Sequence, residues 1–151
     1  MLSSKEYKIP QIRLSYVSDY SIEHPKILMA SDIARFIRST YVDGEIEYRE
    51  CFKVVYLNCA HKILGFQTIS EGCTSKCLVD SKMIFAGALL ANAHGIVLCH
   101  NHPSGELRPS PQDDSITNKI VAAAKYLDIE VVDHVIVTND SFYSYSDEGR
   151  I

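Results

Sequence analysis

The sequence predicts an α/β fold of three layers, in which a mixed, curved sheet lies between helices. Two observations predict it. Segments with apolar residues at helical spacing alternate with short apolar runs of strand length. Their order along the chain is helix, hairpin, strand, helix, strand, helix, strand, strand, which favours helices packed on a central sheet.

The beginning of the chain predicts an arm followed by a domain. Apolar and polar side chains alternate within residues 7–17, which indicates a strand. We therefore expect an N-terminal arm or strand over residues 1–27 and one domain over residues 28–151. A helix that begins at Ser31 opens this domain, because serine followed by an acid is a helix-start signal.

The rest of the chain supplies the sheet and its other helices. Residues 50–57 and 62–70 are rich in β-branched and aromatic residues and predict a hairpin. The following helix is apolar nearly all round, so we expect it to be deeply packed. The remaining elements are expected as a helix over residues 81–93, a strand over 95–99, a helix over 110–128 and strands over 130–138 and 142–145.

Composition limits the class of protein. Of 151 residues, 46% are hydrophobic and 23% charged, as in soluble globular proteins. No apolar run approaches about 18 residues, so no membrane span is expected. The first residues lack the core of a signal peptide, and five cysteines, an odd number, fit reduced thiols in the cytoplasm. A net charge of −4 argues against a nucleic-acid partner but leaves room for a local basic patch. The oligomeric state, a homo-oligomer included, stays open.

Potential metal ligands stand where the strand over residues 95–99 runs into a loop. His100 and His102 project to the same side if the backbone there is extended, and Asp113 follows after the loop. Imidazole nitrogens and a carboxylate oxygen are the ligands of catalytic zinc sites, which use three protein ligands and leave one position for water. The spacing therefore predicts a metal site.

Ser110 and Asp113 also have a purely local interpretation. Serine is a good N-cap, Pro111 suits the first helical position, and an acid three residues after the serine completes a capping box. The two interpretations are compatible, because a carboxylate in the first turn of a helix can point back to the end of a strand.

These residues belong to a longer pattern. It consists of His-Asn-His-Pro-Ser-Gly at 100–105, then Ser110, Asp113 and Thr117, with an Asp-His pair at 133–134. The pattern His-x-His-x7-Ser-x2-Asp resembles the JAMM (MPN+) metalloprotease motif, and the full string resembles the RadC-like branch of that superfamily. The resemblance covers residues 45–151 well and the N-terminal part loosely.

The resemblance implies a JAB/MPN domain of cytidine-deaminase-like fold, including the order of its layers. It implies Zn²⁺ bound by His100, His102 and Asp113, with Ser110 stabilising an oxyanion. A glutamate on an early strand is the family's general acid/base, in a Glu-x-Phe segment matched here by Glu50. Glu45 and Glu47 lie close in sequence and leave that assignment open. The implied substrate is an amide in a peptide or isopeptide bond.

Other candidate ligands have simpler interpretations. His134 is either a fourth ligand or a residue behind the ligands or in the core, and the open position of catalytic zinc favours the second. Cys73 and Cys77 lack a second Cys/His pair at zinc-ribbon spacing, so small buried side chains are the default.

Two further functions stay in competition with a zinc-dependent hydrolase. One is a non-catalytic MPN interaction domain, against which the retained ligand set argues. The other is a DNA-repair accessory protein, because RadC-like proteins carry a DNA-repair label and longer members have an N-terminal helix-hairpin-helix domain. We expect a short form that lacks this domain, since the sequence has no glycine hairpin pair of that kind.

Overall fold

The computed structural model describes residue 16, residues 23–72 and residues 78–151. The predicted N-terminal strand lies outside the described residues except for Tyr16, whose hydroxyl donates a hydrogen bond to the carbonyl of Leu64 at 2.7 Å. Cys73 and Cys77 also lie outside them, so the interpretation of these two cysteines stays a prediction.

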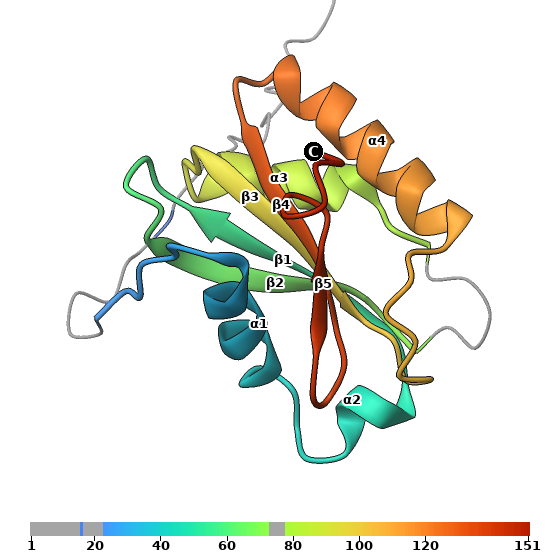
Figure 1. The fold of residues 1–151 in the computed structure, drawn as a ribbon. Helices are drawn as coiled ribbons and strands as arrows, with labels where there is room; N and C mark the ends of the chain where they lie inside the picture. Colours follow the sequence, from blue (N-terminus) through green and yellow to red (C-terminus); the bar gives the residue numbers. More distant parts are fainter. Residues whose placement is uncertain (1–15, 17–22, 73–77) are drawn as a thin grey trace, which may run out of the picture.

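The predicted mixed sheet is confirmed. Five strands lie in the order β2-β1-β3-β4-β5 (Figure 1). β3 and β4 are parallel, and the other neighbours are antiparallel. The strands are β1 (Cys51–Leu57), β2 (Ile63–Glu71), β3 (Gly95–Asn101), β4 (Glu130–Val137) and β5 (Phe142–Ser144).

Helices cover both faces of this sheet and give the three layers. One buried cluster joins α1 to one face, and a second joins α3 and α4 to the other. Figure 1 shows α1 on one side of the strands, with α3 and α4 on the opposite side. The helices are α1 (Ala30–Arg38), the short α2 (Glu45–Tyr48), α3 (Ser81–Leu90) and α4 (Pro111–Lys125). The sequence did not predict α2.

The alternation of side chains along β3 decides which residues meet which helices. Ile96 and Leu98 belong to the cluster beneath α3 and α4, whereas Val97 and Cys99 belong to the cluster beneath α1. Side chains on a strand alternate between its faces. His100 therefore faces the side of α3 and α4, and the next residue faces the side of α1.

A β-bulge changes this alternation in β4. Ile96 pairs with Val131, but Val97 pairs with Asp133, so Val132 is an extra residue. A bulge of this kind re-aims the side chains that follow it. Because of it, His134 lies on the same face as Val131, three residues earlier, instead of on the opposite face. His134 thus comes to the side of the sheet that carries His100.

The expectation for α3 was wrong in part. Only Ile84, Phe85 and Ala88 are buried, whereas Met83 and Leu89 are about half exposed, at 46% and 53%. The helix lies in an outer layer, so one side meets the sheet and the other faces outward despite its apolar residues. Within the described ranges, no helix combines the length and the apolar character needed to cross a membrane.

Candidate metal centre

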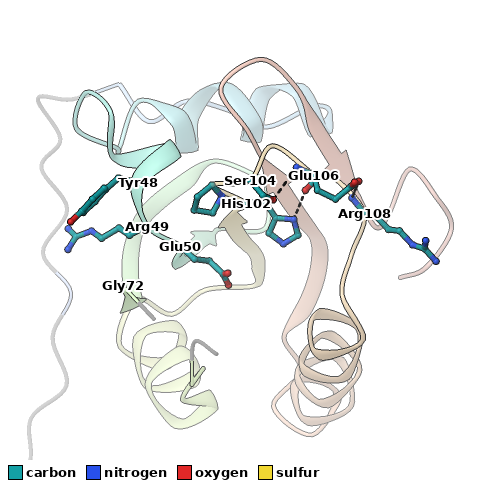
Figure 2. A pocket seen from close by; sticks show the side chains of 9 residues that line it. Tyr48, Arg49, Glu50, Gly72, His102, Ser104, Glu106 and Arg108 are labelled. Atoms are coloured by element: carbon teal, nitrogen blue, oxygen red, sulfur yellow. Dashed lines mark hydrogen bonds between the residues drawn. The ribbon is translucent and has the colours of Figure 1, made fainter. Parts of the chain in front are cut away.

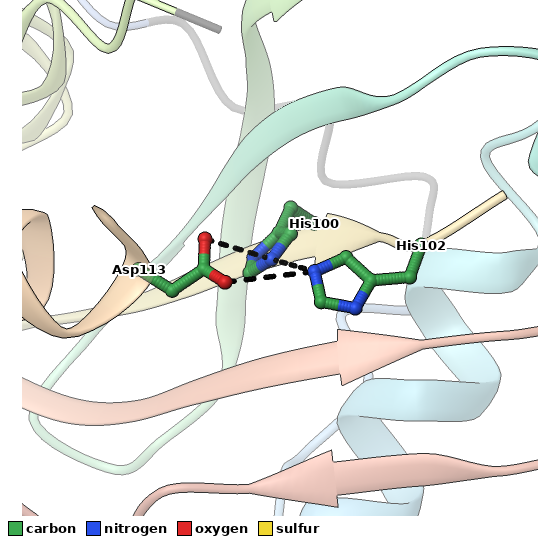
Figure 3. Close-up of side chains that lie close together, drawn as sticks. All are labelled: His100, His102 and Asp113. Carbon is green, nitrogen blue, oxygen red and sulfur yellow. Dashed lines mark hydrogen bonds and ion pairs between the residues drawn. The ribbon is translucent and has the colours of Figure 1, made fainter. Parts of the chain in front are cut away.

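Three potential ligands converge at the C-terminal end of β3. His100 and His102 lie two residues apart at the end of the strand, and Asp113 faces them from the first turn of α4 (Figure 3). The Nε2 atoms of the two histidines lie 2.9 Å apart. The carboxylate of Asp113 lies 3.3 Å from Nε2 of His100 and 3.6 Å from Nε2 of His102.

The start of α4 fixes the orientation of Asp113. Ser110 is the N-cap, Pro111 is in the first turn, and the predicted capping box is present. The backbone N–H of Ser110 donates to Oδ2 of Asp113 at 2.7 Å, and Oγ of Ser110 accepts from the N–H of Asp113 at 3.2 Å. The same carboxylate therefore caps the helix and points at the histidines, so the local and the metal interpretations are compatible, as expected.

Hydrogen bonds assign the tautomer of His102. Its Nδ1 lies 2.6 Å from the carbonyl oxygen of Glu106. A carbonyl only accepts, so Nδ1 carries the proton and Nε2 of the neutral ring carries a lone pair.

A longer chain of hydrogen bonds assigns the tautomer of His100. The hydroxyl of Thr117 donates to the carbonyl of Asp113 at 2.5 Å, so its oxygen accepts from Nδ1 of His134 at 2.6 Å. Complete burial holds the pKa of His134 well below its usual range, and the ring is therefore neutral. Its Nε2 must then accept from Nδ1 of His100, 2.8 Å away. The Nε2 atom of His100 is left with a lone pair that faces the site.

The cluster thus holds acceptors that face one another. Two imidazole lone pairs and a carboxylate repel at these distances unless a proton or a cation lies between them. Bonds of about 2.0–2.1 Å in a tetrahedral zinc site put two ligand atoms about 3.3 Å apart, close to the three separations observed. The donor set and its spacing fit Zn²⁺. Among the described residues, these three form the one group of histidine, cysteine or acidic side chains close enough to share a metal ion.

The electrostatics of the cluster agree with this fit. Burial raises the pKa of Asp113, but the side chains of His100 and His102 outweigh it and hold that pKa well below its usual range. Burial lowers the pKa of His102, yet Asp113, the Glu106 carbonyl and Glu50 together raise it. Asp113 is therefore ionised at neutral pH, and its negative charge favours a cation between the three side chains.

Glu50 lies beside this cluster, directly before β1. Phe52 pairs with His100 in the antiparallel register of β1 and β3. Continuing that register by two residues brings Glu50 opposite His102, on the same face of the sheet. Both side chains line a pocket of about 510 Å³, and Figure 2 shows them reaching into it together.

The neighbouring glutamates lie elsewhere. Glu45 binds the guanidinium of Arg49 at 2.7 Å and 3.2 Å and accepts from the N–H of Val42. Glu47 is exposed on α2 and does not line the pocket. The geometry brings Glu50, rather than either of these, to the cluster.

Two contributions could not be read from the sequence pattern alone. His134 was expected behind the ligands or in the core, and its contact with His100 depends on the bulge in β4. Thr117 matched the family string, but nothing in its spacing indicated that it orients His134.

The pocket beside Glu50 and His102 is also lined by Tyr48, Arg49 and Arg108.

Comparisons with known proteins identify the family of this chain. The family model of the RadC-like JAB domain matches residues 27–150. A relative named UPF0758 protein from Flavobacterium johnsoniae is 42% identical over 106 residues, which cover 70% of this chain and 46% of the relative. Another, from Chlorobaculum parvum, is 35% identical over 135 residues, 85% of this chain and 61% of the relative. A third, from Thermotoga maritima, is 36% identical over 103 residues, 68% of this chain and 46% of the relative. The chain spans about half the length of the curated relatives it matches.

Proposed function

Because the chain belongs to the RadC-like JAB domain family, we propose that it is a zinc-dependent hydrolase that cleaves an amide bond. The observation that carries the proposal is the convergence of two imidazole lone pairs and one carboxylate on a single point. A surplus of acceptors in a mostly buried cluster calls for a cation, and this donor set matches catalytic zinc sites.

His100, His102 and Asp113 hold the ion in this proposal. Zinc at such a site lowers the pKa of its water to about 7 and polarises a carbonyl. Three protein ligands leave a position for that water. His134 supports His100 from behind, since it accepts the Nδ1 proton and keeps Nε2 turned to the site.

Glu50 acts as the general acid/base. Its side chain lines the same pocket as His102, and Glu50 directly precedes β1, the strand that pairs with β3. It accepts a proton from the attacking water and returns it to the leaving amine. Proton transfer of this kind contributes about 10²–10⁴-fold in rate.

Ser110 donates to the developing oxyanion. Its Oγ uses a lone pair, not its proton, in the capping box, because it accepts from the N–H of Asp113. The hydroxyl proton is therefore still available for a substrate oxygen. Capping and catalysis do not compete for the same atom.

The proposed substrate is a peptide or isopeptide amide. The pocket is lined by both acidic and basic side chains, among them Glu106 and Arg108, which suits a polar amide better than a fully apolar ligand.

The experiment uses purified protein and a library of peptides and lysine-linked isopeptides, with cleavage read by mass spectrometry. We expect about one zinc per chain and metal-dependent cleavage. Glu50→Gln should keep the zinc and lose about 10²–10⁴-fold of turnover, because it removes only the proton acceptor.

Glu47→Gln is the matched control, since Glu47 is exposed on α2, three residues from Glu50, and does not line the pocket. It should cleave like the wild type. The proposal fails if zinc-loaded protein cleaves no member of the library, or if Glu50→Gln cleaves as fast as the wild type.

A further inference from the structure

Asn101 stands between the two histidines in sequence but points to the other face of the sheet. It is fully buried, at 0% exposure. Its side chain faces α1 and α2, whereas His100 and His102 face the candidate metal centre. The proposed reaction assigns no role to this residue.

The amide of Asn101 makes four hydrogen bonds. Oδ1 accepts from the N–H of Cys51 at 2.8 Å and from the hydroxyl of Tyr41 at 3.1 Å. Nδ2 donates to the carbonyl of Ile46 at 2.7 Å and to that of Arg49 at 2.8 Å. An amide has two donor protons and two acceptor lone pairs, so its capacity is fully used.

Two of these hydrogen bonds are made to the residues on either side of Glu50. The carbonyl of Arg49 precedes it and the N–H of Cys51 follows it, and one side chain holds both. A third hydrogen bond comes from the residue that follows β2, because the N–H of Gly72 donates to the carbonyl of Glu50 at 2.9 Å. The backbone of Glu50 is therefore fixed on both sides and at its own carbonyl.

The end of β3 thus has a different role on each face of the sheet. Two histidines on one face line the candidate metal centre, and the asparagine between them holds the residues that flank Glu50. We propose that Asn101 is a positioning residue that fixes the Glu50 carboxylate relative to His100 and His102. The inference rests on the proposed role of Glu50 as acid/base.

The residue type is specific to this task. Aspartate has nearly the same shape but no donor, so it would set a carboxylate oxygen against the carbonyls of Ile46 and Arg49. Serine is too short to reach both sides of Glu50. Only a short amide offers two donors and an acceptor at once. A displacement of about 1 Å in such a site costs about 10²-fold in rate.

The test compares Asn101→Asp and Asn101→Ser with Tyr41→Phe. The last variant removes one of the four bonds without touching the residues that flank Glu50, and it keeps the ring that packs under the Lys53 ammonium group, 3.6 Å from its centroid. Each variant is first checked for folding and for one zinc per chain. We expect kcat to fall about 10²-fold in the two Asn101 variants with KM nearly unchanged, and Tyr41→Phe to stay near the wild type.

A double-mutant cycle separates positioning from general damage. In the Glu50→Gln background, Asn101→Asp should cost no more than about twofold further, because the group that it positions is already gone. A loss that persists in full in that background would overturn the proposal, as would wild-type activity in both Asn101 variants.

A second readout does not depend on turnover. Protein with ¹³C-labelled glutamate is loaded with Co²⁺, and the paramagnetic relaxation of the Glu50 carboxyl carbon is measured, with Glu50→Gln to assign the signal. This relaxation falls with the sixth power of distance, so it should drop several-fold in Asn101→Asp and not in Tyr41→Phe. Unchanged relaxation overturns the positioning role even if the protein is a hydrolase. A drop in a protein that cleaves nothing supports positioning and rejects the proposed reaction instead.

Discussion

Asp133 and His134 are neighbours in β4, yet they belong to clusters of opposite character. The carboxylate of Asp133 accepts from the hydroxyl of Ser144 at 2.6 Å, from the N–H of His134 at 2.7 Å and from the N–H of Ser146 at 2.9 Å. Its acceptors are matched by donors of the same chain. This cluster joins β4 to β5 and the turn that follows.

His134 leads into a cluster in which acceptors outnumber donors. It receives the Nδ1 proton of His100, whose Nε2 then faces His102 and Asp113 without a proton of its own. Both carboxylates are largely buried, yet the pKa of Asp133 is raised by burial and that of Asp113 is held low by the two imidazoles. A buried polar cluster whose donors match its acceptors stabilises the fold, whereas a surplus of acceptors indicates a cation site.

The contrast between the Asp133 cluster and the Asp113 cluster would be wrong if Asp113 did not bind metal. We expect Asp113→Ala to lower zinc affinity by more than about 100-fold. This exceeds the loss that is usual when a residue that only orients a metal ligand is changed. Zinc competition against a chromophoric chelator measures it.

Asp114→Asn is the control, because Asp114 lies in the same helical turn but binds Tyr145 and Arg150, each at 2.8 Å. Full zinc occupancy in Asp113→Ala, or equal losses in the two variants, would reject the ligand assignment.

A smaller effect is expected from Thr117, which acts two hydrogen bonds away. Thr117→Val removes the acceptor for Nδ1 of His134 and thereby frees the tautomers of His134 and His100. We expect zinc affinity to fall about 10-fold to 100-fold, as for other residues that orient a ligand. Thr117→Ser keeps the hydroxyl and should bind zinc nearly as well as the wild type. Equal affinity in Thr117→Val and Thr117→Ser would contradict the orienting role.

The convergence of His100, His102 and Asp113 was predictable from sequence because its geometry is local. Alternation along a strand sets His100 and His102 on one side, and a capping signal at Ser110 fixes where Asp113 begins its helix. The mixed sheet and most elements followed from periodicity, and the layer order from the family resemblance.

The rest depends on tertiary pairing that spacing does not encode. The extra residue Val132 reverses the alternation in β4, and only the strand partner reveals it. The four bonds of Asn101 join segments about fifty residues apart in sequence. The outward face of α3 is apolar, so periodicity alone could not tell which side was buried.

The smallest expected effect concerns the cluster around Asp133 and the dependence of stability on pH. Burial raises the pKa of Asp133 above its ordinary value, and the hydrogen bonds from Ser144 and from the N–H groups of Ser146 and His134 offset this only in part. The folded protein thus holds this proton more tightly than the unfolded chain. Its contribution to stability is present below the unfolded pKa of about 3.8 and is lost as pH rises through the folded pKa.

Asp133→Asn lacks this titration. It should cost about 1 kcal/mol at low pH, since its amide fits the three donors less well, and its stability relative to the wild type should increase as pH rises through that window. Urea unfolding of both chelator-treated proteins between about pH 3 and 7 measures the difference. A difference that stays constant or falls with pH would contradict the raised pKa. Because Asp133 belongs to the cluster with matched donors, zinc affinity should stay unchanged, and a loss of zinc in this variant would show that the two clusters are not separate.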